Sequence, residues 1–340
     1  MEGTIEQSAK TSAAQGTAPG NAQRILVLTG RYGTPAVLVL LLIGFTAADP
    51  QTFLTGQNLL NILNQSATLA IVAGGLTLPL VAGKFDLSFA SVISLSGILA
   101  VGFLERSGLP WLAAILLALV AAGFIGLVNG FLVAHLRIDP IVATLGTSTM
   151  LLGINYAYSN GTPITLQGGP FTEVARASVL GVPAPIILAV IVLGGLWVAL
   201  NFTLLGHHMQ AVGANQVAAR MAGVRVARTT VIAFVVCGLC AGLAGIVLSA
   251  RIGSGQVTAG DGYLLNAFAA VFLGASVLRD GDFHILGSLV GVLIVTVTFN
   301  GLSLLGAESY VQFLFQGGIL VAATALSSTS RRMLLASARR

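Results

Sequence analysis

GHHMQAVGANQVAARMAGVRVAR, residues 206–228, is the longest polar interval between apolar runs after residue 31. It carries two histidines and three arginines, so it cannot lie in hydrocarbon and must sit in water between two membrane spans. A helix from Gln210 to Met221 would place Val212, Val217 and Met221 near one side, which predicts a short amphipathic segment. Such a segment either lies on lipid headgroups or docks into another protein.

The composition identifies the solvent of this chain as a lipid bilayer. Of its 340 residues, 56% are hydrophobic and only 8% are charged, whereas soluble domains carry roughly 25% charged residues. The 42 glycines agree, because close helix packing in lipid favours small residues. A pI near 9.7 does not indicate nucleic acid, since the basic residues are scattered at the ends of apolar runs. The fold class predicted is all-α and integral to the membrane.

The apolar runs predict about ten transmembrane helices of bilayer length. They lie near residues 33–49, 57–82, 87–104, 110–135, 139–158, 183–203, 229–250, 262–279, 285–306 and 310–327. Two five-helix halves would enter the membrane in opposite senses, which permits an inverted repeat. The expected domains are a disordered cytoplasmic tail over 1–31, a transmembrane domain over 32–328 with a cytoplasmic loop at 204–228, and a basic cytoplasmic tail over 329–340.

Basic residues give the orientation, because Lys and Arg are retained on the cytoplasmic side. With both termini inside, thirteen of the sixteen basic residues are cytoplasmic, and Arg106, Arg176 and Arg251 are outside. The loop at 204–228 is then cytoplasmic.

The sequence carries no motif that would let this chain drive transport by itself. The only Gly-Lys pair, Gly83-Lys84, lacks the spacing of a phosphate-binding loop, so we expect no bound ATP and no other cofactor. The acidic residues lie in the tail, in loops or near span ends, and the histidines share no metal-ligand spacing, so we expect neither a coupling charge nor a metal. The chain is therefore not an enzyme; it is either a passive pore or is driven by a separate motor.

Five motifs stand in order along the chain: KFDLSFASVISLSG (84–97), TLGTSTMLLGINYAYSNGTPI (144–164), AVGANQVAARMAGV (211–224), FVVCGLCAGLAGIVLSARIGSGQVTAGDGY (234–263) and NGLSLLG (300–306). Together they resemble the permeases of the ribose/simple-sugar class of bacterial ABC transporters. The resemblance implies an importer in the bacterial inner membrane with two permease chains, two ATPases that use the ATP, and a periplasmic sugar-binding protein. The second permease chain would be an identical copy or a paralogue. This chain departs from the family pattern at Lys84, His207, Leu264, Asn266 and residues 279–282, which leaves the sugar open.

In that reading the loop couples the permease to its ATPase. The small residues could let a helix sink into a groove of the partner, and the loop lacks the Trp, Phe or Leu anchors of an interfacial helix. The predicted coupling residues are Ala211, Gly213, Asn215, Ala218, Ala219, Arg220 and Gly223.

Two further sets of polar residues lie at or within the spans. Asp86 and Ser88 begin an apolar run and are expected to cap a helix at the cytoplasmic boundary. Neutral polar side chains within the spans either line a path for a polyhydroxylated sugar or hydrogen-bond between helices. These path candidates are Asn61, Asn64, Gln65, Thr144, Thr147, Asn155 and Asn300.

The function predicted is translocation of a sugar, a pentose or related small carbohydrate. The alternatives are an ABC permease for branched-chain amino acids or nucleosides, and a facilitator that needs no motor.

Overall fold

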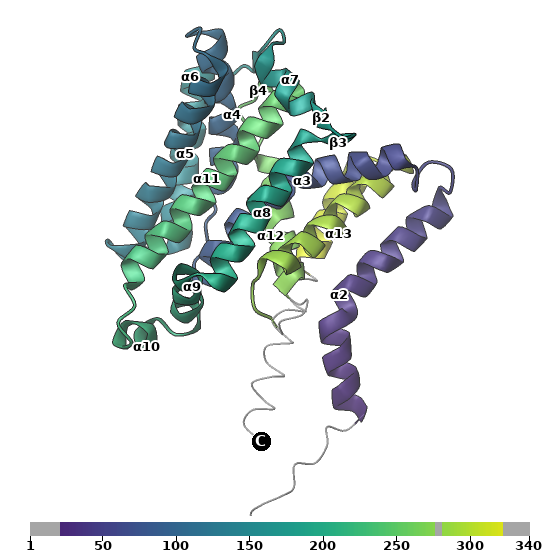
Figure 1. Ribbon diagram of the computed structural model, residues 1–340, viewed down its shortest axis with the longest axis vertical. Coiled ribbons are helices and arrows are strands. Elements are labelled where there is room, and N and C mark those ends of the chain that lie inside the picture. Colours follow the sequence, from purple (N-terminus) through teal and green to yellow (C-terminus); the bar gives the residue numbers. More distant parts are fainter. Residues whose placement is uncertain (1–20, 276–280, 322–340) are drawn as a thin grey trace, which may run out of the picture.

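The computed structural model describes residues 21–275 and 281–321, and the chain there is an α-helical bundle (Figure 1). The helices are α2 Asn21–Ala48, α3 Gly56–Val81, α4 Phe89–Glu105, α5 Trp111–Ala134, α6 Pro140–Ser159, α7 Pro170–Arg176, α8 Ala184–Phe202, α9 Leu204–Ala214, α10 Gln216–Met221, α11 Val226–Ile252, α12 Asp261–Ala275 and α13 Ile285–Leu304. A further apolar helix runs over Ser309–Val321.

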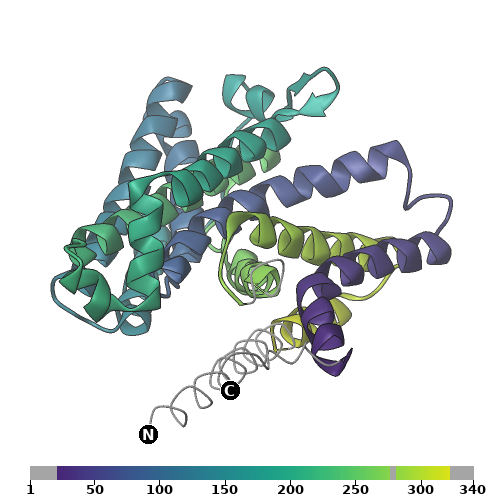
Figure 2. The same ribbon diagram turned by 60° about the horizontal axis from the view of Figure 1, so that its bottom comes forward.

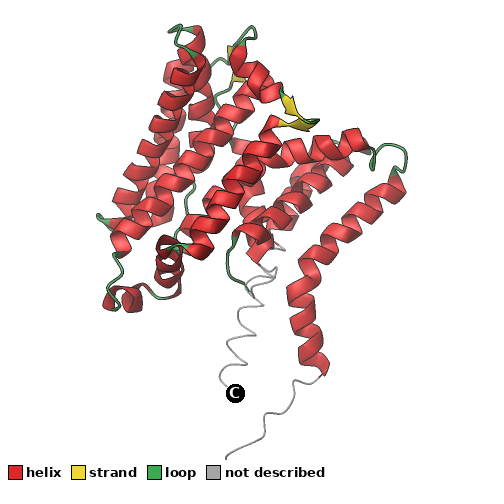
Figure 3. Ribbon diagram, in the orientation of Figure 1, coloured by secondary structure: helices red, strands yellow, loops and turns green. Residues whose placement is uncertain are grey.

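Two small antiparallel sheets accompany the helices. β1 (Ile164–Thr165) pairs with β4 (Ser254–Gly255), and β2 (Ser178–Val179) pairs with β3 (Val182–Pro183). Figure 3 shows these strands at the end of the bundle opposite α10.

A helix lies at each of the ten intervals predicted to span the membrane, and the described ends differ from the predicted ones by a few residues at most, except that α2 begins at Asn21 and not near residue 33. Among the described helices, α3, α5, α8, α11 and α13 are long and apolar enough to cross a bilayer. The all-α membrane fold is therefore confirmed. One boundary was wrong: α2 begins at Asn21, inside the segment expected to be a disordered tail, where Ile25–Leu28 supplies an apolar run. The expected tails at 1–20 and 329–340 lie outside the described residues.

Helix α11 occupies the centre of the bundle and packs against α3, α4 and α5. Small residues let these helices pack closely together. A Cβ added at Gly126 of α5 would lie 2.4 Å from the carbonyl oxygen of Phe234, and one at Gly75 of α3 would lie 2.5 Å from the Cβ of Cys240. Larger side chains at these glycines would push the helices apart.

Helices α3 and α11 both connect the two ends of the bundle. The 27 residues of α11 extend about 40 Å, from Val226 just after α10 to Ile252 just before β4. Helix α3 runs between the same two ends, and Figures 1 and 2 show α13 lying alongside it. Any feature near α10 is thus joined to the opposite end by two continuous helices.

Candidate functional site

The loop at 204–228 folds as two short helices, α9 and α10, which we call the α9–α10 elbow (residues 204–221). The single helix expected from Gln210 to Met221 is interrupted at Asn215, whose backbone is extended (φ −158°, ψ 105°). Its side-chain oxygen accepts hydrogen bonds from the N–H groups of Val217 and Ala218, both at 3.0 Å. Asn215 is therefore the N-cap of α10, and its own side chain explains the break.

Helix α9 is held tightly against the bundle. A Cβ added at Gly213 would lie 1.9 Å from the carbonyl oxygen of Val81, at the end of α3. Gln210 donates from Nε2 to the carbonyl of Leu200 on α8 at 3.0 Å, and Met209 is fully buried. The predicted coupling residue Gly213 thus packs α9 onto α3 within the same chain.

Helix α10 presents an exposed face that is partly apolar. Val217 is 73% exposed and Met221 is 85% exposed, with Arg220 also exposed beside them. Ala219 faces the other way and is buried in a small cluster with Val212 and Val226. A surface of this kind suits contact with another protein.

The seven predicted coupling residues therefore divide into two groups. The exposed ones are Asn215, Ala218, Arg220 and Gly223, and those that pack at least partly against the chain itself are Ala211, Gly213 and Ala219. Gly223 adopts φ +84° directly after α10, which a side chain would strain.

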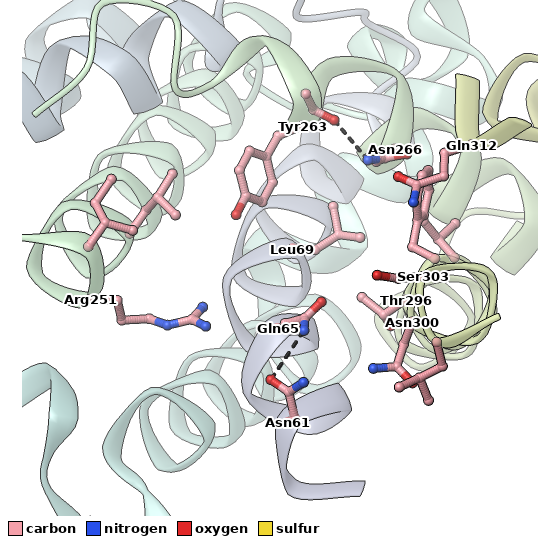
Figure 4. Close-up of a pocket in the computed structure, with 16 residues that line it drawn as sticks. Asn61, Gln65, Leu69, Arg251, Tyr263, Asn266, Thr296, Asn300, Ser303 and Gln312 are labelled. Carbon is pink, nitrogen blue, oxygen red and sulfur yellow. Dashed lines mark hydrogen bonds between the residues drawn. The ribbon is translucent and has the colours of Figure 1, made fainter. Parts of the chain in front are cut away.

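A polar cavity of about 660 Å³ lies at the opposite ends of α3 and α11 (Figure 4). Its lining includes Asn61 and Gln65 of α3, Arg251 of α11, and Tyr263 and Asn266 of α12. Thr296, Asn300 and Ser303 of α13 and Gln312 of the helix that follows close the other side. Its volume is in the range of small-molecule sites.

Hydrogen bonds fix several of the groups in this cavity. Arg251 donates from Nη1 to the backbone carbonyl of Asn64 at 3.3 Å and to Oγ1 of Thr68 at 3.4 Å. Gln65 donates to Oδ1 of Asn61 at 3.2 Å. Asn266 donates to a backbone carbonyl, but its Oδ1 is buried without a partner among the described residues.

The seven path candidates lie in different surroundings. Asn61, Gln65 and Asn300 line the cavity, although Asn300 also exchanges two 3.0 Å hydrogen bonds with Asn58. Asn64 lines an adjoining pocket of about 450 Å³. Arg251, Tyr263 and Asn266 were not predicted, because their convergence depends on helix packing that the sequence does not display.

The three candidates on α6 do not reach the cavity. Thr144 accepts a hydrogen bond from the N–H of Leu87 at 3.1 Å, and Thr147 donates to Oδ1 of Asn129 at 2.7 Å. Asn155 is fully buried and donates to the carbonyl of Val257 at 3.4 Å. These residues hold segments of the chain together, which is the alternative role expected for them.

Asp86 and Ser88 form a buried network. Asp86 is 1% exposed, and its Oδ1 accepts from the N–H of Ser88 at 2.8 Å and from its Oγ at 2.7 Å. Asn129 of α5 donates to Oγ of Ser88 at 2.7 Å. Ser88 stands at the N-cap position of α4, but its side chain makes no capping bond. The expected cap is therefore wrong at Ser88, whose Oγ bonds to Asp86 and Asn129, whereas Asp86 accepts from the backbone N–H of Ser88 at the start of α4.

An apolar helical bundle with a polar cavity at one end and a polar helical elbow at the other defines a multi-pass membrane transport protein. Residues 58–324 match the family described as branched-chain amino acid transport system / permease component, and the chain belongs to this family. Among its relatives, the ribose import permease protein RbsC of Escherichia coli K12 is 38% identical over 84% of this chain and 90% of that protein. RbsC of Bacillus subtilis is 37% identical over 85% and 90%, and the E. coli D-allose transport system permease protein AlsC is 31% identical over 87% and 91%. No solved structure matches the chain significantly.

Proposed function

We propose that this chain is the membrane-spanning permease subunit of an ATP-driven ABC importer for a sugar, a pentose or related small carbohydrate. The observation that carries the proposal is the 38% identity to a ribose import permease over 84% of the chain. Relatives named for D-allose and L-arabinose transport, at 31% and 34% identity, favour the same substrate class.

The proposed assembly has an ATPase on the cytoplasmic side, a periplasmic sugar-binding protein, and a second permease chain, identical or paralogous. The chain would cross an inner membrane about ten times, with both termini cytoplasmic and the two halves related as an inverted repeat. This orientation puts the α9–α10 elbow in the cytoplasm and the polar cavity on the periplasmic side.

The elbow supports a mechanical role. A partner bound to the exposed face of α10 would move α9. Helix α9 in turn packs against the end of α3, where Gly213 contacts Val81. Both α3 and α11 carry side chains of the cavity at their other ends. Closure of the ATPases would therefore tilt the same helices that line the path, which is alternating access driven from one side.

Uptake into membrane vesicles tests the proposal. Vesicles holding this chain, its ATPase and its binding protein should accumulate labelled ribose or arabinose when ATP is present, and not with a non-hydrolysable analogue. The family description favours one alternative, a permease for branched-chain amino acids, and labelled leucine taken up in place of the sugars would select it. Sugar uptake that persists without ATP would instead identify a facilitator.

A further inference from the structure

Among the described residues that line the polar cavity, Arg251 is the only one with a charged side chain, and none is an aspartate or a glutamate. In the described part of the chain, no carboxylate forms an ion pair with Arg251, whose hydrogen-bond partners are a backbone carbonyl and the hydroxyl of Thr68. The cavity therefore carries an uncompensated positive charge.

The charge of Arg251 is held in a fixed position in the cavity, where a solute would pass. Figure 4 shows the guanidinium of Arg251 extending toward Gln65, with the ring of Tyr263 on the same side of the cavity. The two hydrogen bonds to α3 use one nitrogen, Nη1, which leaves donors on the other nitrogens. Nearby amides, together with the unpartnered Oδ1 of Asn266, add neutral donors and acceptors.

The chemistry of these groups distinguishes among solutes. A sugar presents neighbouring hydroxyls that can accept from guanidinium N–H groups and donate to amide oxygens. An ammonium group would meet a fixed cation and find no carboxylate to pair with, so it would be repelled and unpaired.

We propose that the polar cavity is a charge-selecting subsite for the sugar, in which Arg251 admits neutral or anionic carbohydrates and excludes cationic ones, amino sugars included. The proposal rests on the proposed function for the identity of the solute. The positive field of the cavity can be measured whatever the solute.

A cysteine in the cavity can report its charge. Gln65→Cys is placed in a chain whose two cysteines, Cys237 and Cys240, are replaced by alanine; both are free and buried. The rates of modification by an anionic and a cationic methanethiosulfonate reagent are then compared in membrane vesicles. We expect Arg251→Gln to lower the anionic-to-cationic rate ratio by about tenfold or more, because the field acts on the two reagents with opposite sign.

Two controls make the result specific. Arg251→Lys keeps the charge and should keep most of the ratio, whereas Arg106→Gln removes an arginine outside the cavity lining and should leave it unchanged. An equal ratio with and without Arg251 would overturn the proposal, as would a cysteine at 65 that reacts with neither reagent. If the ratio falls as expected but no sugar is transported, the positive field of the cavity stands, whereas the proposed function and the sugar as its solute fail.

Discussion

A quantitative prediction follows from the contact between Gly213 and the end of α3. In Gly213→Ala the new Cβ would start 1.9 Å from the carbonyl oxygen of Val81, far inside the 3.0 Å below which real Cβ contacts essentially do not occur. The obstacle is backbone, so α9 or the end of α3 must shift by about 1 Å or more. Overpacking of this kind costs about 1 to 3 kcal/mol, a factor of roughly 5 to 150 in the population of docked α9.

Because Gln210 and Met209 still anchor α9, we expect the helix to be displaced rather than unfolded. The assay is sugar uptake per ATP hydrolysed in proteoliposomes that contain the permease and its ATPase and are supplied with the binding protein. Gly213→Ala should lower this ratio at least about fivefold, matching the lower end of the packing penalty. The matched control is Gly194→Ala within α8, where an added Cβ meets nothing within 4 Å. If both variants couple as the parent chain does, the reasoning that force passes from α9 to α3 is refuted.

Three further variants test other parts of the account. Asn215→Ala removes the acceptor of two N–H groups at the start of α10 and should cost about 1 kcal/mol of local stability, seen as faster amide exchange in α10; unchanged exchange would show that the cap is unimportant. Arg220→Glu reverses a charge on the exposed face of α10 and should weaken ATPase binding about tenfold or more in a titration, and undiminished affinity would count against that face as the contact. Asn129→Ala removes one hydrogen-bond partner each from buried Ser88 and half-buried Thr147 and should cost about 1 to 3 kcal/mol, read as a lower melting temperature in detergent, whereas exposed Thr149→Ala should melt like the parent.

The positions of the helices could be predicted from the sequence because apolar runs of bilayer length are a one-dimensional signal. Polar breaks between the runs, such as Asp49–Gly56, mark the helix ends to within a few residues. The break inside the elbow was missed although Asn215 is a favoured N-cap residue. Its neighbours also suit a continuous helix, so the sequence alone does not show that the Asn215 side chain caps a separate α10 rather than lying within one longer helix.

The cavity could be predicted only in part. Asn61, Gln65 and Asn300 are polar residues in apolar surroundings, so the sequence identifies them as candidates. Which polar residues face one another depends on how α3, α11, α12 and α13 pack, and Arg251 lies at a helix end where an arginine is ordinary. The burial of Asp86 could not be predicted either, because a carboxylate in a connection between helices is usually exposed to water.

The central claim is that a separate ATPase drives this bundle through the exposed face of α10. A photo-crosslinker attached at Val217→Cys, in the chain without its own cysteines, tests it directly, with Val198→Cys on the exposed apolar surface of α8 as control. The account predicts a covalent adduct with the ATPase from position 217 and none from position 198. Lipid adducts alone at position 217, with the ATPase present and active, would contradict it.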